Sequence, residues 1–126
     1  MTAGFTVAQA CAMSLLVFTG ASQLAVVSVI DAGGAVGTAV ANGIMLSLRH
    51  VAYGAAVSRV LPRHLGKRLL SSQVIIDEST AMAAAQTDRA TARFAFTVTG
   101  ATLFVAWNLS TLAGALLSTN VTNPET

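Results

Sequence analysis

The chain alternates long uncharged stretches with short groups of charged residues. Three stretches contain no Asp, Glu, Lys or Arg: Met1–Ile30, Ala32–Leu48 and Phe94–Pro124. A helix needs about 20 mainly apolar residues to cross a hydrocarbon core about 30 Å thick. Each stretch, with short extensions, provides a segment of about that length, so the pattern predicts helices that cross a membrane.

Glycines, prolines and charges mark where these helices begin and end. We predict a first helix from about Val7 to Ile30 and a turn over Asp31–Gly34, because glycines adopt backbone angles that other residues resist. A second helix, Ala35–Val60, ends before Pro62. The segment Leu69–Gln86 is shorter and contains two acids, so it is predicted to be broken or re-entrant. A last helix covers about Phe94–Ser118.

This pattern predicts an all-α integral membrane protein, a multi-pass helical bundle of about four apolar segments. Residues 1–126 form one domain, and no internal repeat is visible in the sequence. The alternative, three buried helices in a soluble protein, fails because 126 residues cannot cover three apolar helices with polar material. A signal peptide is rejected because Met1–Ala10 contains no Lys or Arg.

Composition and charge further restrict the class of protein and its partners. Only 10% of the residues are charged and mean hydropathy is +0.69, whereas soluble domains carry about 25% charged residues. Most basic residues lie in or near the segment 59–68, RVLPRHLGKR, which the positive-inside tendency places in the cytoplasm. Few aromatic residues lie near them, which argues against nucleic acid. The single Cys11 gives no disulfide or metal framework, and no cofactor is expected.

Four polar residues lie inside the predicted membrane segments, where a charge is costly. Asp77 and Glu78 are neighbours, so on a helix they point about 100° apart. One can pair with Arg49 while the other takes up a proton or meets substrate; the alternative is that both lie at the membrane surface. Arg49 either binds a substrate carboxylate or forms a structural ion pair. His50 either relays protons or packs as a neutral side chain.

Two further groups of residues suit contacts between helices. Gly20 is flanked by Thr19, Ser22 and Gln23, small and polar residues that permit close packing and interhelical hydrogen bonds. The same group also fits a break in the helix whose freed backbone groups line a cavity. Trp107, Thr111 and Gly114 share one face of the last helix. Simple packing is the alternative for both groups.

Four segments occur in the order typical of one family: SLLVFTGASQLA (14–25), LSLRHVAYG (46–54), VIIDESTAMA (74–83) and WNLSTLAGALL (107–117). The chain resembles the AzlC-type exporters of branched-chain amino acids. The matching residues are Phe18, Gly20, Gln23, Arg49, His50, Tyr53, Asp77, Glu78, Ser79, Trp107, Thr111 and Gly114. Departures are Ser47, where the family usually has Asn, and Ile76 and Thr80, where it has Thr and Phe.

The resemblance implies a permease of the bacterial inner membrane that exports branched-chain amino acids, namely leucine, isoleucine and valine, with methionine as a further candidate. It implies ion- or proton-coupled transport with a small membrane partner of the AzlD type. It also implies that this chain corresponds to the central part of a longer family domain. Arg49, with Asp77 or Glu78, could then hold the two charged groups of an amino acid, with apolar walls around its side chain.

Three other functions compete with the exporter. In a non-transporting membrane subunit or assembly factor, the same polar residues would only hold helices together. A membrane enzyme is disfavoured because no nucleophile–base pair or metal-ligand spacing is apparent. A channel is disfavoured because no repeated polar stripe runs along the helices.

Overall fold

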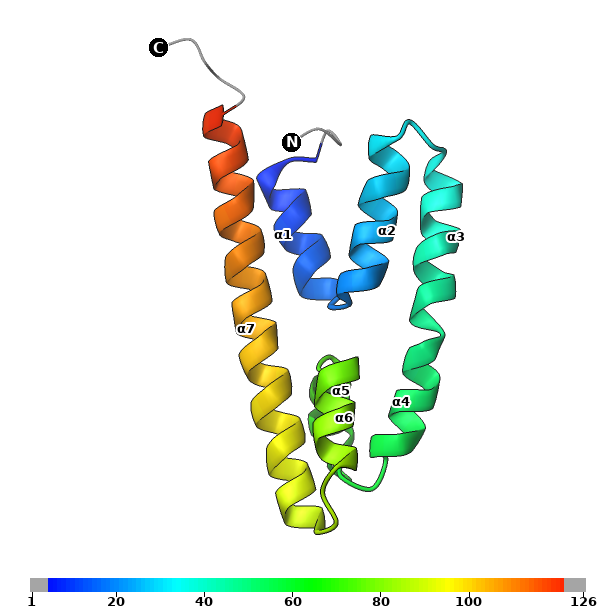
Figure 1. The fold of residues 1–126 in the computed structure, drawn as a ribbon, viewed down its shortest axis with the longest axis vertical. Coiled ribbons are helices and arrows are strands. Elements are labelled where there is room, and N and C mark those ends of the chain that lie inside the picture. Colours follow the sequence, from blue (N-terminus) through cyan, green and yellow to red (C-terminus); the bar gives the residue numbers. More distant parts are fainter. Residues whose placement is uncertain (1–4, 122–126) are drawn as a thin grey trace. The chain divides into compact units, whose positions relative to one another are not determined.

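The computed structural model describes residues 5–121, with side chains as far as residue 118. These residues form helices and contain no strand (Figure 1). The helices in chain order are α1 (Val7–Leu16), α2 (Gly20–Asp31), α3 (Val36–Ser47), α4 (Arg49–Val57), α5 (Leu65–Ser72), α6 (Asp77–Ala84) and α7 (Arg89–Val121). The all-α prediction is therefore confirmed over the described chain.

One described helix is long and apolar enough to cross a membrane by itself: the segment Arg89–Ser118 of α7. Only 11% of its most apolar window is buried, whereas the core helix of a soluble protein would be mostly buried. Large apolar side chains such as Leu16, Val51 and Leu117 are likewise well exposed. This surface is unlike that of a soluble domain.

The single helix predicted from Val7 to Ile30 is wrong, because the chain forms two helices there. Val17 leaves the helical conformation, and Thr19 is extended with φ −146° and ψ 110°. The hydroxyl of Thr19 then accepts a hydrogen bond of 3.3 Å from the N–H of Ser22 and caps the start of α2. As Figure 1 shows, α2 runs back in the opposite direction to α1. Local capping therefore overrides the continuous apolar pattern.

The second predicted helix, Ala35–Val60, is also interrupted. Gly33 has φ +75° in the predicted turn, and α3 begins after it. Leu48 separates α3 from α4 but keeps helical angles of φ −57° and ψ −30°. The backbone thus stays close to helical from Val36 to Val57, about 33 Å at 1.5 Å per residue.

The break predicted within Leu69–Gln86 is present. Helix α5 ends at Ser72 and α6 begins at Asp77, with extended backbone at Ile76 (φ −129°, ψ 173°). The two acids lie in the first turn of α6 rather than in the middle of a helix. A helix N-terminus carries partial positive charge and favours carboxylates there.

Helix α7 starts five residues earlier than the predicted Phe94. Asp88 explains the difference, since one of its carboxylate oxygens accepts a 2.8 Å hydrogen bond from the N–H of Thr91. That bond holds the pKa of Asp88 below its ordinary value. The cap allows Arg89 and Arg93 to join the helix although they are charged.

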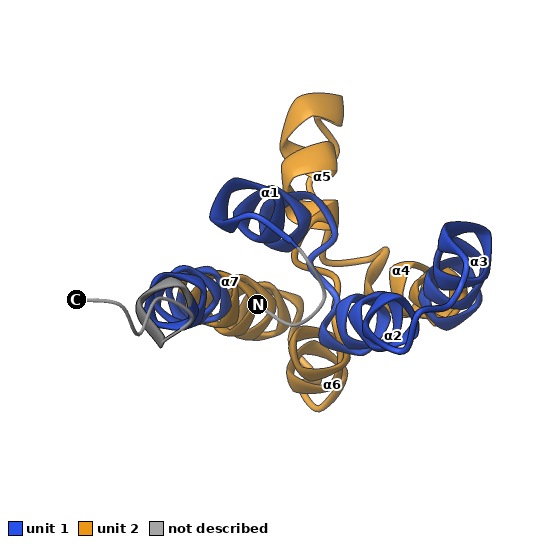
Figure 2. Cartoon of the chain, turned by 90° about the horizontal axis from the view of Figure 1, so that it is seen from above, with its two compact units in different colours: residues 1–47, 106–126 blue, residues 48–105 orange. Residues whose placement is uncertain are grey.

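The contacts gather in two compact units, coloured in Figure 2: residues 1–47 with 106–126, and residues 48–105. In the first unit α2 packs against α3, where a Cβ on Gly43 would lie 3.0 Å from Val26. The second unit has an apolar core of Val57, Val60, Leu61, Ile75, Ala83, Ala92 and Phe96. The prediction of a single domain stays a prediction.

The order of helices occurs twice along the chain, which the sequence pattern did not reveal. Two short helices, α1 and α2, precede the nearly continuous α3–α4, and two short helices, α5 and α6, precede the long α7. Ser22 and Ser79 occupy the same place in this order, as the buried third residue of α2 and of α6. Few residues are identical between the halves, so the similarity lies in the elements.

Candidate functional site

The candidate site in the second unit centres on an ion pair between Arg49 and Asp77. Arg49 is the first residue of α4 and Asp77 the first of α6. Nη1 of Arg49 lies 2.8 Å from Oδ2 of Asp77, and the two side chains are 36% and 46% exposed. The pair is therefore open to a ligand rather than sealed in a core.

One nitrogen of the same guanidinium is not used by this pair. Nε of Arg49 is buried and has no hydrogen-bond partner among the described residues. The hydroxyl of Thr80 in α6 is also buried, and it has no hydrogen-bond partner among the described residues. Buried polar groups are nearly always satisfied, so such groups call for a ligand or water.

Glu78 differs from Asp77 although the two are adjacent. It is exposed, whereas Asp77 is only partly so, and no ion pair within the described chain involves it. Of the two acids, Arg49 thus takes Asp77 as partner. This leaves Glu78 available to a proton or a cationic group at the start of α6.

Ser79 fixes the extended turn that places these acids. Its hydroxyl lies 2.6 Å from the carbonyl oxygen of Val74, to which it donates, and accepts a 3.2 Å hydrogen bond from the N–H of Ile76. Ser79 is fully buried at 0% exposure. Its role is therefore to hold the turn between α5 and α6.

His50 and Tyr53 lie on α4, close to Arg49 in the sequence. Their rings meet edge to face, with centroids 5.7 Å apart and an angle of 71° between planes. This arrangement is favourable for aromatic rings and orients the imidazole. Both side chains are partly buried.

The first unit contains a separate polar network around Gln23. The indole Nε1 of Trp107 donates a 2.8 Å hydrogen bond to Oε1 of Gln23. Nε2 of Gln23 donates in turn to the carbonyl oxygen of Met13, at 3.0 Å. That carbonyl, in the last turn of α1, also accepts the backbone N–H of Val17 at 2.8 Å, so the Gln23 amide is a second donor to it and ties α2 to the end of α1.

Glycine at position 20 allows a close approach of the same indole. A Cβ on Gly20 would lie 3.0 Å from Cη2 of Trp107. A larger residue at this position would require the indole to move by a few tenths of an ångström. Gly114, by contrast, has open space where a Cβ would stand, with no atom within 4 Å, and the described contacts give it no role.

Hydroxyl pairs complete this network. The Thr111 hydroxyl donates to the carbonyl oxygen of Trp107 at 3.0 Å, so Ser14 donates to Thr111 at 3.2 Å. The Ser47 hydroxyl donates to the Gly43 carbonyl oxygen at 2.8 Å. A second pair therefore forms in which Ser22 donates to Ser47, at 3.1 Å.

The structure thus divides the sequence-predicted residues into two groups. Arg49, His50, Tyr53, Asp77, Glu78 and Ser79 belong to the second unit, and Phe18, Gly20, Gln23, Ser47, Trp107, Thr111 and Gly114 belong to the first. Sequence reasoning missed Ser14, because a serine in an apolar helix gives no signal until its partner is known. It noted Thr80 only as a departure from a motif.

No cluster of three or more His, Cys, Asp or Glu side chains suited to a metal ion occurs among the described residues. The second unit instead contributes a guanidinium, two carboxylates and an imidazole at the starts of α4 and α6. Such groups suit a ligand that carries both a negative and a positive charge.

These features define an all-helical protein with an exposed apolar helix of membrane-crossing length and a charged site at a broken helix. The family model described as AzlC protein matches residues 1–121. The chain belongs to the AzlC family, a family of membrane proteins related to branched-chain amino-acid transport rather than to enzymatic catalysis. Comparison with curated proteins gives no match, and comparison with solved structures gives none either.

Proposed function

We propose that this chain is a permease of the bacterial inner membrane that exports branched-chain amino acids. The observation that carries the proposal is the half-exposed pair of Arg49 and Asp77 at the start of a broken helix, with Glu78 beside it. The guanidinium would bind the substrate carboxylate, for which its buried Nε still has a free donor. An acidic side chain would bind the substrate ammonium group.

Coupling of transport to protons or another ion would use whichever of the two acidic side chains does not bind the substrate. Glu78 is the better candidate, because Asp77 already has a cationic partner. His50 lies beside Arg49 in the sequence and would pass protons toward this site. A small AzlD-type subunit would complete the transporter, with leucine, isoleucine, valine and methionine as substrates.

Helix lengths support a particular path through the membrane. Helices α1 and α2 have 10 and 12 residues, about 15 and 18 Å, which is half of a hydrocarbon core about 30 Å thick. Each of α5 and α6 has 8 residues. We propose that both short pairs are re-entrant, and that α3–α4 and α7 cross the membrane. Broken helices are tolerated at that depth when they line a cavity, as in many transporters.

The charges favour this path over four crossings. With two crossings, the loop 59–68 and the residues Arg89 and Arg93 lie on the same side of the membrane, which is the cytoplasm. With four crossings, Arg89 and Arg93 would lie outside, against the positive-inside tendency. Asp31 faces the outside in both cases.

Export is tested by measuring accumulation of labelled leucine, isoleucine, valine and methionine in cells with and without the chain, and with and without a small partner subunit. Accumulation should fall when the chain is present. Asp77→Asn and Glu78→Gln should each abolish that effect, while Asp31→Asn, which removes an exposed acid of the other unit, should not. Unchanged export in both site variants would refute the mechanism.

A non-transporting subunit or assembly factor is the second candidate. The observation that favours it is the network of Gln23, Trp107 and Met13, in which the named groups satisfy one another. In that case Asp77→Asn should lower the amount of protein in the membrane. Transport per remaining molecule should then stay unchanged.

A further inference from the structure

A pocket in the second unit combines two cations with an apolar wall. It has a volume of about 270 Å³ and lies between α5, the first turns of α7 and the segment around Val60. Lys67 and Ser71 line it from α5, and Arg93 and Thr97 line it from α7. Leu70 and Phe96 provide apolar walls. None of these residues belongs to the Arg49–Asp77 site.

The positive charge of the pocket is not neutralised by any ion pair with a described residue. No ion pair within residues 5–118 involves Lys67 or Arg93. The three acidic residues of this unit do not line the pocket. Asp77 pairs with Arg49, Asp88 caps α7, and Glu78 lies in the first turn of α6. Two unpaired cations with the Ser71 hydroxyl nearby suit a phosphate group, while the Thr97 hydroxyl donates to the carbonyl oxygen of Arg93 at 2.9 Å.

The apolar walls indicate which phosphate compound the pocket would take. Leu70 is 78% exposed, and Leu65 and Leu69 on the same short helix are 70% and 63% exposed. A helix that combines exposed leucines with Lys67 and Arg68 is typical of segments that lie at a membrane surface. An inorganic phosphate would use the cations alone, whereas a phospholipid uses the cations and the leucines together.

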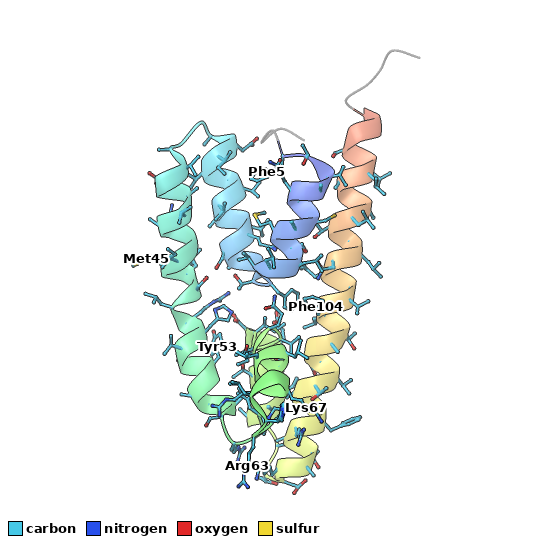
Figure 3. The ribbon with its side chains drawn as sticks, turned by 180° about the vertical axis from the view of Figure 1, so that it is seen from behind. Phe5, Met45, Tyr53, Arg63, Lys67 and Phe104 are labelled. Carbon is cyan, nitrogen blue, oxygen red and sulfur yellow. The ribbon has the colours of Figure 1, made fainter. Side chains whose placement is uncertain are left out.

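We propose that this pocket binds the headgroup of an anionic phospholipid, with its acyl chains along the exposed leucines of α5. Figure 3 labels Lys67 and also Arg63, which belongs to the same basic segment but does not line the pocket. Basic pockets on the cytoplasmic side of membrane proteins commonly bind such lipids. The proposal requires that the chain lies in a bilayer, but it does not depend on amino-acid export.

Native mass spectrometry of the full chain in neutral detergent provides the test, with phosphatidylglycerol and phosphatidylcholine offered in turn. The chain should retain phosphatidylglycerol preferentially. Lys67→Gln and Arg93→Gln should each weaken retention about fivefold, and the double variant about twenty-fivefold. Arg63→Gln and Arg89→Gln remove the same charge outside the pocket and should change retention less than about twofold.

Four outcomes would overturn the proposal. An equal loss in the control variants would show a diffuse effect of net charge. Displacement of the lipid by millimolar inorganic phosphate would show a simple anion site, as would full retention in Leu70→Asn. Equal retention of phosphatidylcholine would show that the pocket does not discriminate between lipids by the charge of the headgroup. Circular dichroism of each variant, together with the conservative Lys67→Arg, separates loss of binding from loss of folding.

Discussion

Trp107 donates its indole N–H to the side-chain oxygen of Gln23, at 2.8 Å, although the two residues are 84 positions apart. Gln23 uses its amide nitrogen to hold the carbonyl oxygen of Met13 at the end of α1. One buried side chain therefore joins both short helices of the first unit to α7. This link explains why a polar residue with 6% exposure lies in so apolar a segment.

Replacing Gln23 by Leu should destabilise the protein by about 1–3 kcal/mol, because the indole N–H and the Met13 carbonyl would lose this partner in a part-buried site. Thermal unfolding in detergent measures this. Asn42→Leu, a change of an exposed polar residue on α3, is the control and should have little effect. Equal stability of the two variants would show that the link contributes nothing.

Two glycines of α7 should respond differently to alanine. A Cβ on Gly100 would lie 2.7 Å from Cβ of Val74 and 3.2 Å from its carbonyl oxygen, so Gly100→Ala must displace the turn that precedes α6. We expect a loss of about 1–3 kcal/mol. Gly114→Ala meets nothing within 4 Å and should be neutral or stabilise the helix by up to about 1 kcal/mol. Unfolding of both variants in detergent measures the difference, and a neutral Gly100→Ala would contradict the packing.

Arg49→Lys should impair transport although the charge is kept. Lysine lacks the planar, branched donor group that can bind Asp77 and a substrate carboxylate together. The half-saturating leucine concentration should rise by about tenfold or more, which corresponds to about 1.4 kcal/mol. Labelled-leucine flux measures it, with Arg63→Lys in the exposed basic segment as control. A similar change in both variants would exclude a specific role for Arg49.

The path through the membrane can be tested with single cysteines in a Cys11→Ala background. Ala32→Cys should react with an impermeant reagent added outside, while His64→Cys and Thr87→Cys should react only after the cells are opened. All three positions are exposed in the structure. External labelling of Thr87→Cys would instead support four crossings, since that path places the loop before α7 outside.

The cap of α7 should make stability depend on pH. The pKa of Asp88 is lowered because its carboxylate accepts the N–H of Thr91, so the ionised form stabilises the folded protein. The contribution is fully present above the unfolded-state pKa, near about 3.9, and is lost as pH falls through the lower folded-state value. Asp88→Asn should lower the unfolding temperature slightly at neutral pH. The gap to wild type should narrow as the pH approaches about 3; a gap that is constant with pH would contradict the cap.

The sequence by itself determined the helical class, the exposed apolar character and the family. Uncharged stretches and the motif residues around Gly20, Arg49, Asp77 and Trp107 were sufficient for that. It also predicted that Leu69–Gln86 is broken or re-entrant, although it placed the two acids in the middle of that segment and not at the start of a helix. These are local or compositional properties, which remain visible before any residue meets a distant partner.

Only the tertiary structure decided which residues act together. It separated Gln23 and Trp107, which satisfy each other, from Arg49 and Asp77, which remain partly open. It also split the first predicted helix, because the Thr19 hydroxyl caps the start of α2 and the Gln23 amide holds α2 to the end of α1. An apolar pattern indicates that a segment avoids water. It does not record where backbone groups find partners from segments far along the chain.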